Sequence, residues 1–400
     1  MRPPSVAVTG MGLVCSQGNT VAEAMRNIFD SPRPPVAPTR FDTPLKEFPV
    51  FEAEGEFMRA LGRDIDPDRY TRTVRIAATA LEEALRMAGL TTPDLAGRRV
   101  ALVMGTTVGV TLSDAVFYRA YREGRAPGAG PYESFAASNP SLALAELLGV
   151  PILPFTIVNA CASSTDAIGL GKQLLDGGMA DLVLAGGGDE VCEVNHTGFA
   201  SLLIYSKYPC CPFDLNREGL NLGTGAAMLV LERQADARAR GCRPTLWVAG
   251  YGTFQDGYNM TAPHPEASGL RRAIEAALEE GGVAPEALAF VNAHGTATKD
   301  NDQAEGRLFA RILRPGTPVV STKGYTGHTL GAAGAIEAVL SLACLRQGRL
   351  MKSGGFAAYD EAVGIVPNAE VRPLEGEAAL STSLGFGGSN AALVLKGERA

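Results

Sequence analysis

A single cysteine lies where an apolar run gives way to small residues. Cys161 occurs in TIVNACASSTDAIGLGKQLLDGG, in which a strand-like segment leads directly into a helical one. Backbone N–H groups and the positive end of the dipole at a helix N-terminus favour a thiolate and can hold an oxyanion. The pattern therefore predicts a nucleophile at Cys161.

Two histidines lie in turns rich in glycine and threonine, each after apolar residues. The segments are VNAHGTATKDND, with His294, and STKGYTGHTLGAAG, with His328, in a chain that has four histidines. Taken singly, Cys161 also fits a buried core residue, and each histidine fits a satisfied polar group. A cysteine with two histidines is the set expected for covalent acyl chemistry, so together they predict a catalytic trio.

Composition narrows the class of protein. The chain has 400 residues, of which 46% are hydrophobic and 20% charged, enough for one large core or two fused ones. Without a basic-then-apolar leader or about 18 uninterrupted apolar residues, we expect a cytoplasmic protein with no membrane insertion. A net charge of −7 argues against nucleic-acid binding. The seven scattered cysteines predict reduced thiols and no metal site.

Apolar strand-like runs alternate with helical runs along the chain, which indicates an α/β fold. We expect strands at 6–9, 100–104, 155–159, 182–185, 226–231, 247–249, 290–293, 319–321, 379–382 and 391–395. We expect helices at 21–29, 72–88, 141–148, 164–175, 269–279, 303–309 and 334–346.

A weak internal repeat divides the chain. VAVTGMG near the start is echoed by WVAGYG at 247–252, and AAMLVLERQ is echoed by AALVLKGER near the end. Chance similarity among strands rich in glycine, alanine and valine is the alternative. The repeat predicts two related halves, 1–240 with the nucleophile and 241–400 with the histidines, and the boundary falls in RQADARARGCRP.

Four motifs together resemble a known family. NACASS, HGTATKDNDQAE, STKGYTGHTLGAAGAIE and LGFGGSN are similar to those of the elongating β-ketoacyl-acyl-carrier-protein synthases, and the similarity runs nearly end to end. The resemblance implies a duplicated, thiolase-like α/β fold with five layers, α/β/α/β/α. It also implies a homodimer, with a heterodimer of related subunits as the alternative.

The implied activity is decarboxylative Claisen condensation in fatty-acid, polyene or polyketide elongation. Cys161 would accept an acyl group from an acyl-carrier protein, and His294 and His328 would stabilise the enolate formed from malonyl thioester. The backbone N–H groups of Cys161 and Phe386 would hold the tetrahedral oxyanion, and Gly387 would permit the close approach. The substrates would ride on the phosphopantetheine arm of the carrier, so no separate cofactor is implied.

Further site residues follow from the same resemblance. Lys323 would organise the histidines, and because a buried ammonium requires a partner, we expect it to contact Glu337 or Asp302. Thr296 and Thr298 would bind the phosphopantetheine amides, although threonines in turns also cap their own backbone. Val108 falls near the bottom of the family's acyl pocket. A run of arginines would steer the acidic carrier, or else simply form a solvated face: Arg59, Arg63, Arg69, Arg72 and Arg75.

Departures from the family pattern leave the substrate open. Ala297 replaces a glycine after His294, Cys211 replaces an arginine, and Thr224 replaces a glutamate. Two other functional classes compete with an elongating enzyme. A non-catalytic partner of the chain-length-factor type would generally lack the cysteine. A thiolase would carry a second cysteine near the C-terminal glycine loop, and an initiation-type enzyme acting on coenzyme A esters would pair one histidine with an asparagine.

Overall fold

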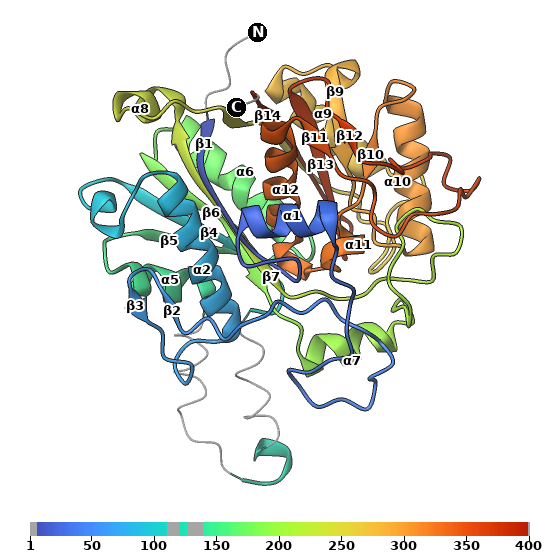
Figure 1. Ribbon diagram of the computed structural model, residues 1–400, viewed down its shortest axis with the longest axis horizontal. Coiled ribbons are helices and arrows are strands. Elements are labelled where there is room, and N and C mark those ends of the chain that lie inside the picture. The colour runs from blue at the N-terminus through green and yellow to red at the C-terminus, as the bar shows by residue number, and fades with distance from the viewer. Residues whose placement is uncertain (1–5, 110–119, 126–138, 399–400) are drawn as a thin grey trace.

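The computed structural model describes residues 6–109, 120–125 and 139–398 (Figure 1). The strands are β1 (Val6–Val14), β2 (Arg59–Ala60), β3 (Arg63–Asp64), β4 (Val100–Gly105), β5 (Leu153–Ile157), β6 (Leu182–Asp189), β7 (Gly225–Arg233), β8 (Leu246–Gln255), β9 (Leu288–Asn292), β10 (Val319–Val320), β11 (Arg349–Leu350), β12 (Arg372–Pro373), β13 (Ala378–Gly385) and β14 (Ser389–Gly397). The α-helices are α1 (Val21–Asp30), α2 (Arg72–Met87), α5 (Pro140–Leu148), α6 (Ser163–Asp176), α7 (Glu193–Ser201), α8 (Gln234–Ala239), α9 (Ser268–Gly281), α10 (Lys299–Ile312), α11 (Lys323–Thr326) and α12 (Ala333–Gln347).

The main sheet consists of two halves with the same topology. Its order is β10-β9-β13-β14-β8-β1-β7-β6-β4-β5. In the first half β4 pairs in parallel with β5 and β6, and β7 runs antiparallel to β6 and β1. The second half repeats this with β9 parallel to β10 and β13, and β14 antiparallel to β13 and β8. The halves meet where β1 pairs with β8.

Helices separate the two halves into layers. α2 packs on the outer face of the first half with α5, and α9 and α10 share an apolar cluster on the outer face of the second. α6 and α12 contact each other and strands of both halves, so they form the central layer (Figure 1). The predicted duplicated five-layer fold is confirmed. The echoed segments are the strand pairs β1 with β8 and β7 with β14.

The central helix α12 is apolar on all sides because it has no solvent face. The stretch Leu330–Gln347 is long and apolar enough to cross a membrane by length and composition alone, but 89% of it is buried inside the protein. Its side chains belong to the largest apolar cluster, which also contains residues of α1, α6 and β1. The composition of α12 therefore reflects packing between the two halves.

All ten predicted strands and all seven predicted helices occur, with ends displaced by a few residues. The prediction missed the two-residue strands β2, β3, β11 and β12 and the short helices α8 and α11. It also missed α7, which contains Gly198 and the β-branched residues Val194 and Thr197, all poor helix formers. The side chain of Asn195 supports its start by accepting from the N–H of Cys192 at 2.9 Å. The predicted boundary at 240/241 falls in the turn after α8 and stays a prediction.

Candidate active site

A strained turn presents Cys161. β5 ends at Ile157 and α6 begins at Ser163, and between them Ala160 has a φ of 46°, in the left-handed region that non-glycine residues rarely adopt. The hydroxyl of Ser163 stabilises the turn by accepting from the N–H of Asn159 at 2.8 Å and donating to the carbonyl of Ala160 at 2.6 Å. This turn directs the cysteine away from the strand and toward the second half of the protein.

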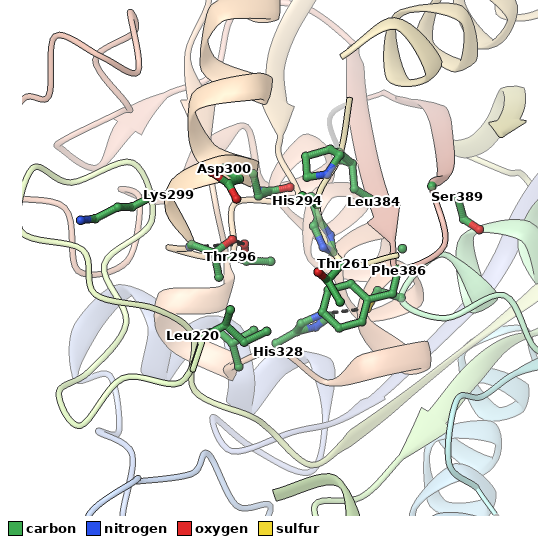
Figure 2. A pocket seen from close by; sticks show the side chains of 18 of the residues that line it. Leu220, Thr261, His294, Thr296, Lys299, Asp300, His328, Leu384, Phe386 and Ser389 are labelled. Atoms are coloured by element: carbon green, nitrogen blue, oxygen red, sulfur yellow. Dashed lines mark hydrogen bonds between the residues drawn. The ribbon is translucent and has the colours of Figure 1, made fainter. Parts of the chain in front are cut away.

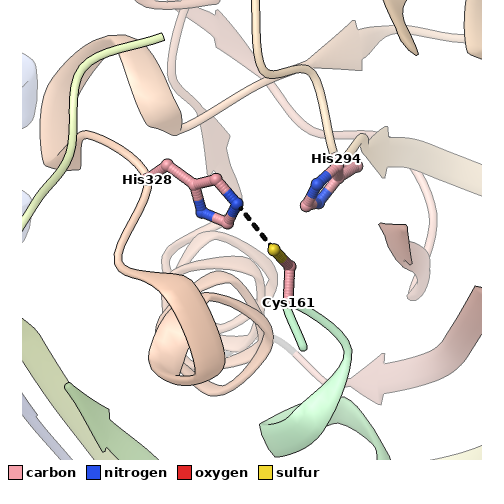
Figure 3. Close-up of side chains that lie close together, drawn as sticks. All are labelled: Cys161, His294 and His328. Carbon is pink, nitrogen blue, oxygen red and sulfur yellow. Dashed lines mark hydrogen bonds between the residues drawn. The ribbon is translucent and has the colours of Figure 1, made fainter. Parts of the chain in front are cut away.

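The predicted trio meets at this point (Figure 3). Sγ of Cys161 lies 3.0 Å from Nε2 of His328. The rings of His294 and His328 are 5.2 Å apart, centre to centre, and nearly perpendicular. One ligand atom from each of the three side chains lies within 4.8 Å of the others. Side chains far apart in the sequence thus converge on one small volume.

The sulfur is less acidic than its position before a helix suggested. Burial raises the pKa of the Cys161 thiol to about 12, although the charge of Lys323 and the backbone N–H of Phe386 lower it in part. The N–H groups of Ala162 and Ser163 donate to the carbonyls of Asn159 and Ala160. The first N–H groups form the turn and burial outweighs the helix dipole, so the pKa of the thiol is raised, where the position before a helix by itself would lower it.

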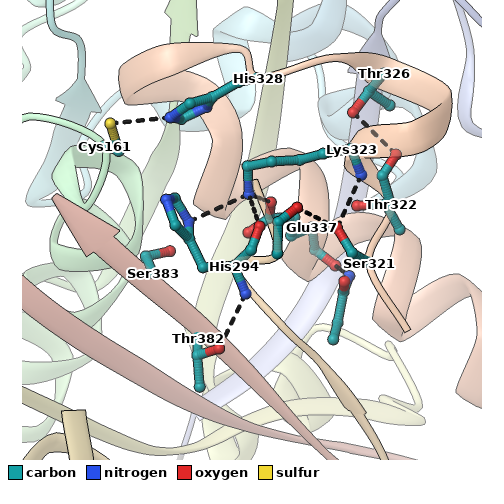
Figure 4. A network of polar contacts seen from close by, with 12 residues as sticks. Cys161, His294, Ser321, Thr322, Lys323, Thr326, His328, Glu337, Thr382 and Ser383 are labelled. Carbon is teal, nitrogen blue, oxygen red and sulfur yellow. Dashed lines mark hydrogen bonds and ion pairs between the residues drawn. The ribbon is translucent and has the colours of Figure 1, made fainter. Parts of the chain in front are cut away.

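Lys323 sets the protonation of His294 (Figure 4). Its ammonium contacts Nδ1 of His294 at 3.2 Å and donates to the carbonyl of the same residue at 2.6 Å. Because an ammonium can only donate, Nδ1 must accept, and the proton of a neutral imidazole is then on Nε2. Burial, with the charge of Lys323 added, lowers the pKa of His294 and of His328 well below 6.5. Both rings are therefore neutral.

Glu337 is the carboxylate that pairs with Lys323. The two form a direct ion pair, and their side chains are 2% and 1% exposed. Asp302, the other predicted partner, instead accepts from the N–H of Phe213 at 2.6 Å and lies 3.8 Å from Nε of Arg217. The difference is one of position, since α12 brings Glu337 to the trio while the first turn of α10 holds Asp302 against the loop that contains Phe213.

Glu305 was not predicted as a site residue, yet it holds the His294 turn. Its carboxylate accepts from the N–H of His294 at 2.9 Å, from the N–H of Gly295 at 2.7 Å and from the hydroxyl of Thr382 at 3.0 Å. Glu305 is 0% exposed and shares a face of α10 with Leu308, three residues on. A carboxylate on the apolar face of a helix is the sequence signal that would have identified it.

The trio opens into a cavity of about 440 Å³ (Figure 2), within the usual range for small-ligand sites. Thr296 and Thr298 line it, and their hydroxyl oxygens are 2.8 Å apart. The ring of Phe386, also in the lining, stacks on Phe199 of α7 at 5.8 Å.

Two predicted substrate-binding residues are not among those that line this cavity. Val108 packs beside it, against an apolar cluster that includes Leu220 and Leu330. Gly387 has a φ of 83°, and its N–H donates to the carbonyl of Met260 at 2.8 Å. Gly387 therefore shapes the loop on which Phe386 lies.

Two family models match the chain. The N-terminal domain of β-ketoacyl synthases matches residues 4–237, and the C-terminal domain matches residues 246–357. The chain belongs to the β-ketoacyl synthase family. Membership makes it an acyl-transferring condensing enzyme with a thiolase-like fold.

Relatives and solved structures agree with this assignment. A 3-oxoacyl-[acyl-carrier-protein] synthase 2 of Staphylococcus aureus (strain N315) is 31% identical, with 98% of each chain covered. A structure of a type II polyketide acyl-carrier protein in complex with its ketosynthase, bound to the hexaketide, has a chain that matches with a TM-score of 0.88 at 25% identity. This match covers 99% of the present chain and 100% of that one. The ishigamide ketosynthase/chain length factor matches with a TM-score of 0.88 at 28% identity, with 99% of each chain covered.

The predicted basic cluster of this β-ketoacyl synthase is largely occupied by contacts within the chain. Arg72 and Arg75 are only 8% and 9% exposed, and their guanidinium groups donate to backbone carbonyls of residues 53–56. Arg59 and Arg69 pair with acidic neighbours. Of the five, Arg63 alone is exposed and makes no ion pair within the described part of the chain. The basic cluster is therefore smaller at the surface than the sequence suggested, because α2 turns Arg72 and Arg75 inward.

Proposed function

We propose that this β-ketoacyl synthase extends an acyl chain by two carbons, with Cys161 as the nucleophile and malonyl-acyl-carrier protein as the extender, in fatty-acid, polyene or polyketide synthesis. The contact between Sγ of Cys161 and Nε2 of His328, at the end of a cavity, is the observation that carries the proposal. The carrier assignment is supported by the names of the relatives, which act on or bind acyl-carrier proteins.

The first step transfers an acyl group to the sulfur. A bond forms between Sγ of Cys161 and the acyl carbonyl carbon, and the bond from that carbon to the carrier's phosphopantetheine sulfur breaks. The thiol proton passes to the departing sulfur, and Nε2 of His328 is the nearest relay. The backbone N–H groups of Cys161 and Phe386 hold the tetrahedral oxyanion. Thr296 and Thr298, which line the cavity, bind the phosphopantetheine arm.

The second step is loss of CO2 from malonyl thioester. The carbon–carbon bond to the carboxylate breaks, and its electron pair becomes an enolate whose oxygen requires hydrogen-bond donors. His294 supplies one from Nε2, since Lys323 occupies its Nδ1. His328 supplies the second from Nε2, in the neutral tautomer whose proton is on that nitrogen. In the first step the ring acts in the other tautomer, with its proton on Nδ1, so that Nε2 can accept the thiol proton. Neutral rings suit this role, because their N–H groups donate hydrogen bonds to the enolate oxygen without transferring a proton to it.

The third step joins the two substrates. The enolate carbon attacks the thioester carbonyl on Cys161, the new carbon–carbon bond forms, and the bond to Sγ breaks. The released thiolate takes up a proton, which restores the resting thiol favoured by the raised pKa of this buried residue. The β-ketoacyl product leaves on the carrier that delivered malonyl.

The proposed chemistry requires no metal ion and no cofactor beyond the phosphopantetheine of the carrier. The trio has the spacing of a three-ligand metal site, but the ligating His294 has an ammonium on its second ring nitrogen where metal sites place a carboxylate or carbonyl. Condensation should keep its full rate after dialysis against a chelator, and loss of activity that zinc restores would contradict this part of the proposal.

Substitution of the nucleophile tests the assignment. Cys161→Ala should abolish acylation of the protein by acyl-carrier protein while leaving the fold intact, since it removes one sulfur from a formed pocket. Intact-protein mass spectrometry would detect the acyl group. Cys242→Ala, which removes a free thiol in the turn after α8, is the matched control and should acylate like the unaltered protein. Acylation of the Cys161→Ala protein would overturn the assignment.

A non-catalytic partner of the chain-length-factor type is the second candidate, because two of the matched structures contain such a factor. The presence of Cys161 in contact with His328 favours a catalytic subunit over it. The same mass-spectrometric experiment distinguishes them, since a non-catalytic partner would not become acylated.

A homodimer through the edge strand β5 completes the proposal. β5 lies at the end of the sheet, and among the described residues β4 is its one partner strand. Leu153 on this strand and Val158 just after it are 55% and 68% exposed. An apolar unpaired edge favours pairing with another chain. Light scattering should show a dimer that Leu153→Lys weakens and the exposed-site control Val366→Lys does not. A protein that dimerises only with a related subunit would replace the homodimer with a heterodimer.

We also propose that the protein is located in the cytoplasm. All seven cysteines are free, which fits a reducing environment. A disulfide found by mass spectrometry of the protein isolated from its cells under non-reducing, thiol-blocked conditions would contradict this assignment.

A further inference from the structure

The loop that carries Phe386 has little stiffness of its own. It joins β13, which ends at Gly385, to β14, and contains Gly387 and Gly388, with φ values of 83° and 85°. Glycines of this kind have wide conformational freedom. The N–H of Phe386 can serve as an oxyanion donor only if the loop is held at a constant distance from Cys161, so some contact must fix it.

On the side away from the nucleophile, the N–H of Gly387 donates to the carbonyl of Met260 at 2.8 Å, and the carbonyl of Gly388 accepts from the N–H of Asp256 at 2.9 Å. The side chain of Asn159 makes the contact on the side of the nucleophile. Its Oδ1 accepts from the hydroxyl of Ser389 at 2.6 Å, at the far end of the loop. At the near end, a Cβ added to Gly385 would lie 3.1 Å from the carbonyl oxygen of Asn159, so the two backbones pack closely. Asn159 lies two residues before the nucleophile. One residue therefore connects the Cys161 turn to both ends of the Phe386 loop.

Asp166 fixes the orientation of the Asn159 amide. Nδ2 of Asn159 donates to Oδ2 of Asp166 at 2.5 Å, and the hydroxyl of Tyr251 donates to Oδ1 at 2.8 Å. Since the carboxylate receives donors, the NH2 group of Asn159 must face it, and the amide oxygen must then face Ser389.

Tyr251 reaches Asp166 because α6 has a glycine beneath the ring. A Cβ added at Gly169 would lie 2.4 Å from the ring of Tyr251, and Gly169 is three residues after Asp166, on the same face of the helix. The N–H of Tyr251, on β8, donates to Glu280 of α9 at 2.7 Å. The chain of contacts thus runs from the second half of the protein to the loop that contains Phe386.

We infer that Asn159 is a positioning residue for the oxyanion site: oriented by Asp166 and Tyr251, it holds the Phe386 loop through Ser389 at the distance from Cys161 that acyl transfer requires. This inference rests on the proposed function of Cys161. The inference predicts different effects on the chemical steps. Acyl transfer and condensation use the Phe386 N–H, whereas decarboxylation uses the histidines. Loss of the Asn159 contact should therefore slow the first kind of step and spare the second.

Two single substitutions test the inference from opposite ends of the hydrogen bond. Asn159→Ala removes the amide beside the nucleophile, and Ser389→Ala removes the hydroxyl from the loop without altering the Cys161 turn. Each should slow acylation by acyl-carrier protein on the order of tenfold to a hundredfold. CO2 release from malonyl-acyl-carrier protein without an acyl primer should stay within about threefold of the unaltered enzyme. A displaced Phe386 N–H slows only the steps that use it, and decarboxylation does not.

Controls separate positioning from general loss of structure. Asn27→Ala removes an amide on α1 that donates to the carbonyl of Gln17, and it should alter neither rate. The double variant of Asn159→Ala and Ser389→Ala should acylate no more slowly than the slower single variant, because both act on one bond. Equal loss of acylation and decarboxylation, or unchanged acylation in the Ser389→Ala protein, would overturn the inference. Failure of the unaltered protein to acylate would instead overturn the proposed function.

Discussion

The two central helices occupy equivalent places in the two halves but contribute opposite kinds of chemistry. In the first half, a short turn leads from β5 to α6 and presents one neutral thiol. In the second half, the longer segment from β10 to α12 carries α11 and His328, and it brings together the buried charges of Lys323 and Glu337. The same β-strand to α-helix unit thus provides the nucleophile once and the electrostatic environment once.

The difference shows that the reactivity of the nucleophile does not come from its own half. Burial raises the pKa of Cys161 to about 12, and the opposing influences are the charge of Lys323 and the N–H of Phe386, both from the second half. The backbone of His328 is in turn held by the first half, since its N–H donates to the carbonyl of Asn221 at 2.8 Å and its carbonyl accepts from the N–H of Gly223 at 3.0 Å. The first half therefore positions the backbone of His328, and the second half supplies the groups that lower the pKa of Cys161.

The largest expected effect separates the two histidines. His294→Ala should lower the rate of malonyl decarboxylation by about a hundredfold to a thousandfold, as removal of one oxyanion donor typically does, while acylation of Cys161 continues. His328→Ala should impair both, because His328 contacts the sulfur directly. CO2 release and intact-protein mass spectrometry measure the two steps. Equal profiles for the two variants would show that the contact between His328 and the sulfur is not needed for acylation.

The second effect concerns the buried ion pair of the second half. Lys323→Met should lower the free energy of unfolding by about 3–5 kcal/mol, because it leaves the carboxylate of Glu337 buried without its partner. Adding Glu337→Gln should recover much of the loss, since both members are then neutral. Denaturant titration of the three proteins measures this. A double variant as unstable as the single one would mean that the pair's charge is not what stabilises the site.

The third effect is a pH dependence of stability. His294 is neutral in the folded protein because burial lowers its pKa well below 6.5, whereas in the unfolded chain it takes up a proton below about pH 6.5. Its contribution is therefore fully present above pH 6.5 and is lost as the pH falls below it, by about 1.4 kcal/mol per pH unit. Relative to His294→Gln, the unaltered protein should lose unfolding free energy between pH 6.5 and 5.5. A constant difference would show that the ring takes up a proton as readily in the folded protein as in the unfolded chain.

The smallest expected effect is at the turn of the first half. Ala160 has a φ of 46°, and glycine adopts this conformation without the Cβ clash that costs other residues about 1–2 kcal/mol. Because glycine also loses more backbone entropy, we expect Ala160→Gly to stabilise by about 0.5 kcal/mol. Thermal unfolding would reveal a small rise in Tm, and acylation should be unchanged. A fall in Tm would mean that the turn is not strained in the unaltered protein.

Sequence reasoning identified Cys161, His294 and His328 because local patterns mark them: each follows an apolar run and lies among small residues that permit a tight turn. It did not identify Glu305 or Asn159, because their roles are contacts with segments distant in the chain. It overestimated the basic surface for the same reason. The sequence pattern predicted that Arg72 and Arg75 lie on a charged helix face. Only the packing of α2 against residues 53–56 shows that they are buried.

The sequence by itself determined the kinds of chemistry available, the order of strands and helices, and the duplication of the fold, because residue type and local periodicity are properties of short segments. Only the tertiary structure decided that Glu337 and not Asp302 pairs with Lys323, that the thiol rests protonated, and that one amide ties the nucleophile to the Phe386 loop. Those outcomes depend on burial and on the distance between side chains from different elements, and these quantities exist only after the elements have packed against one another.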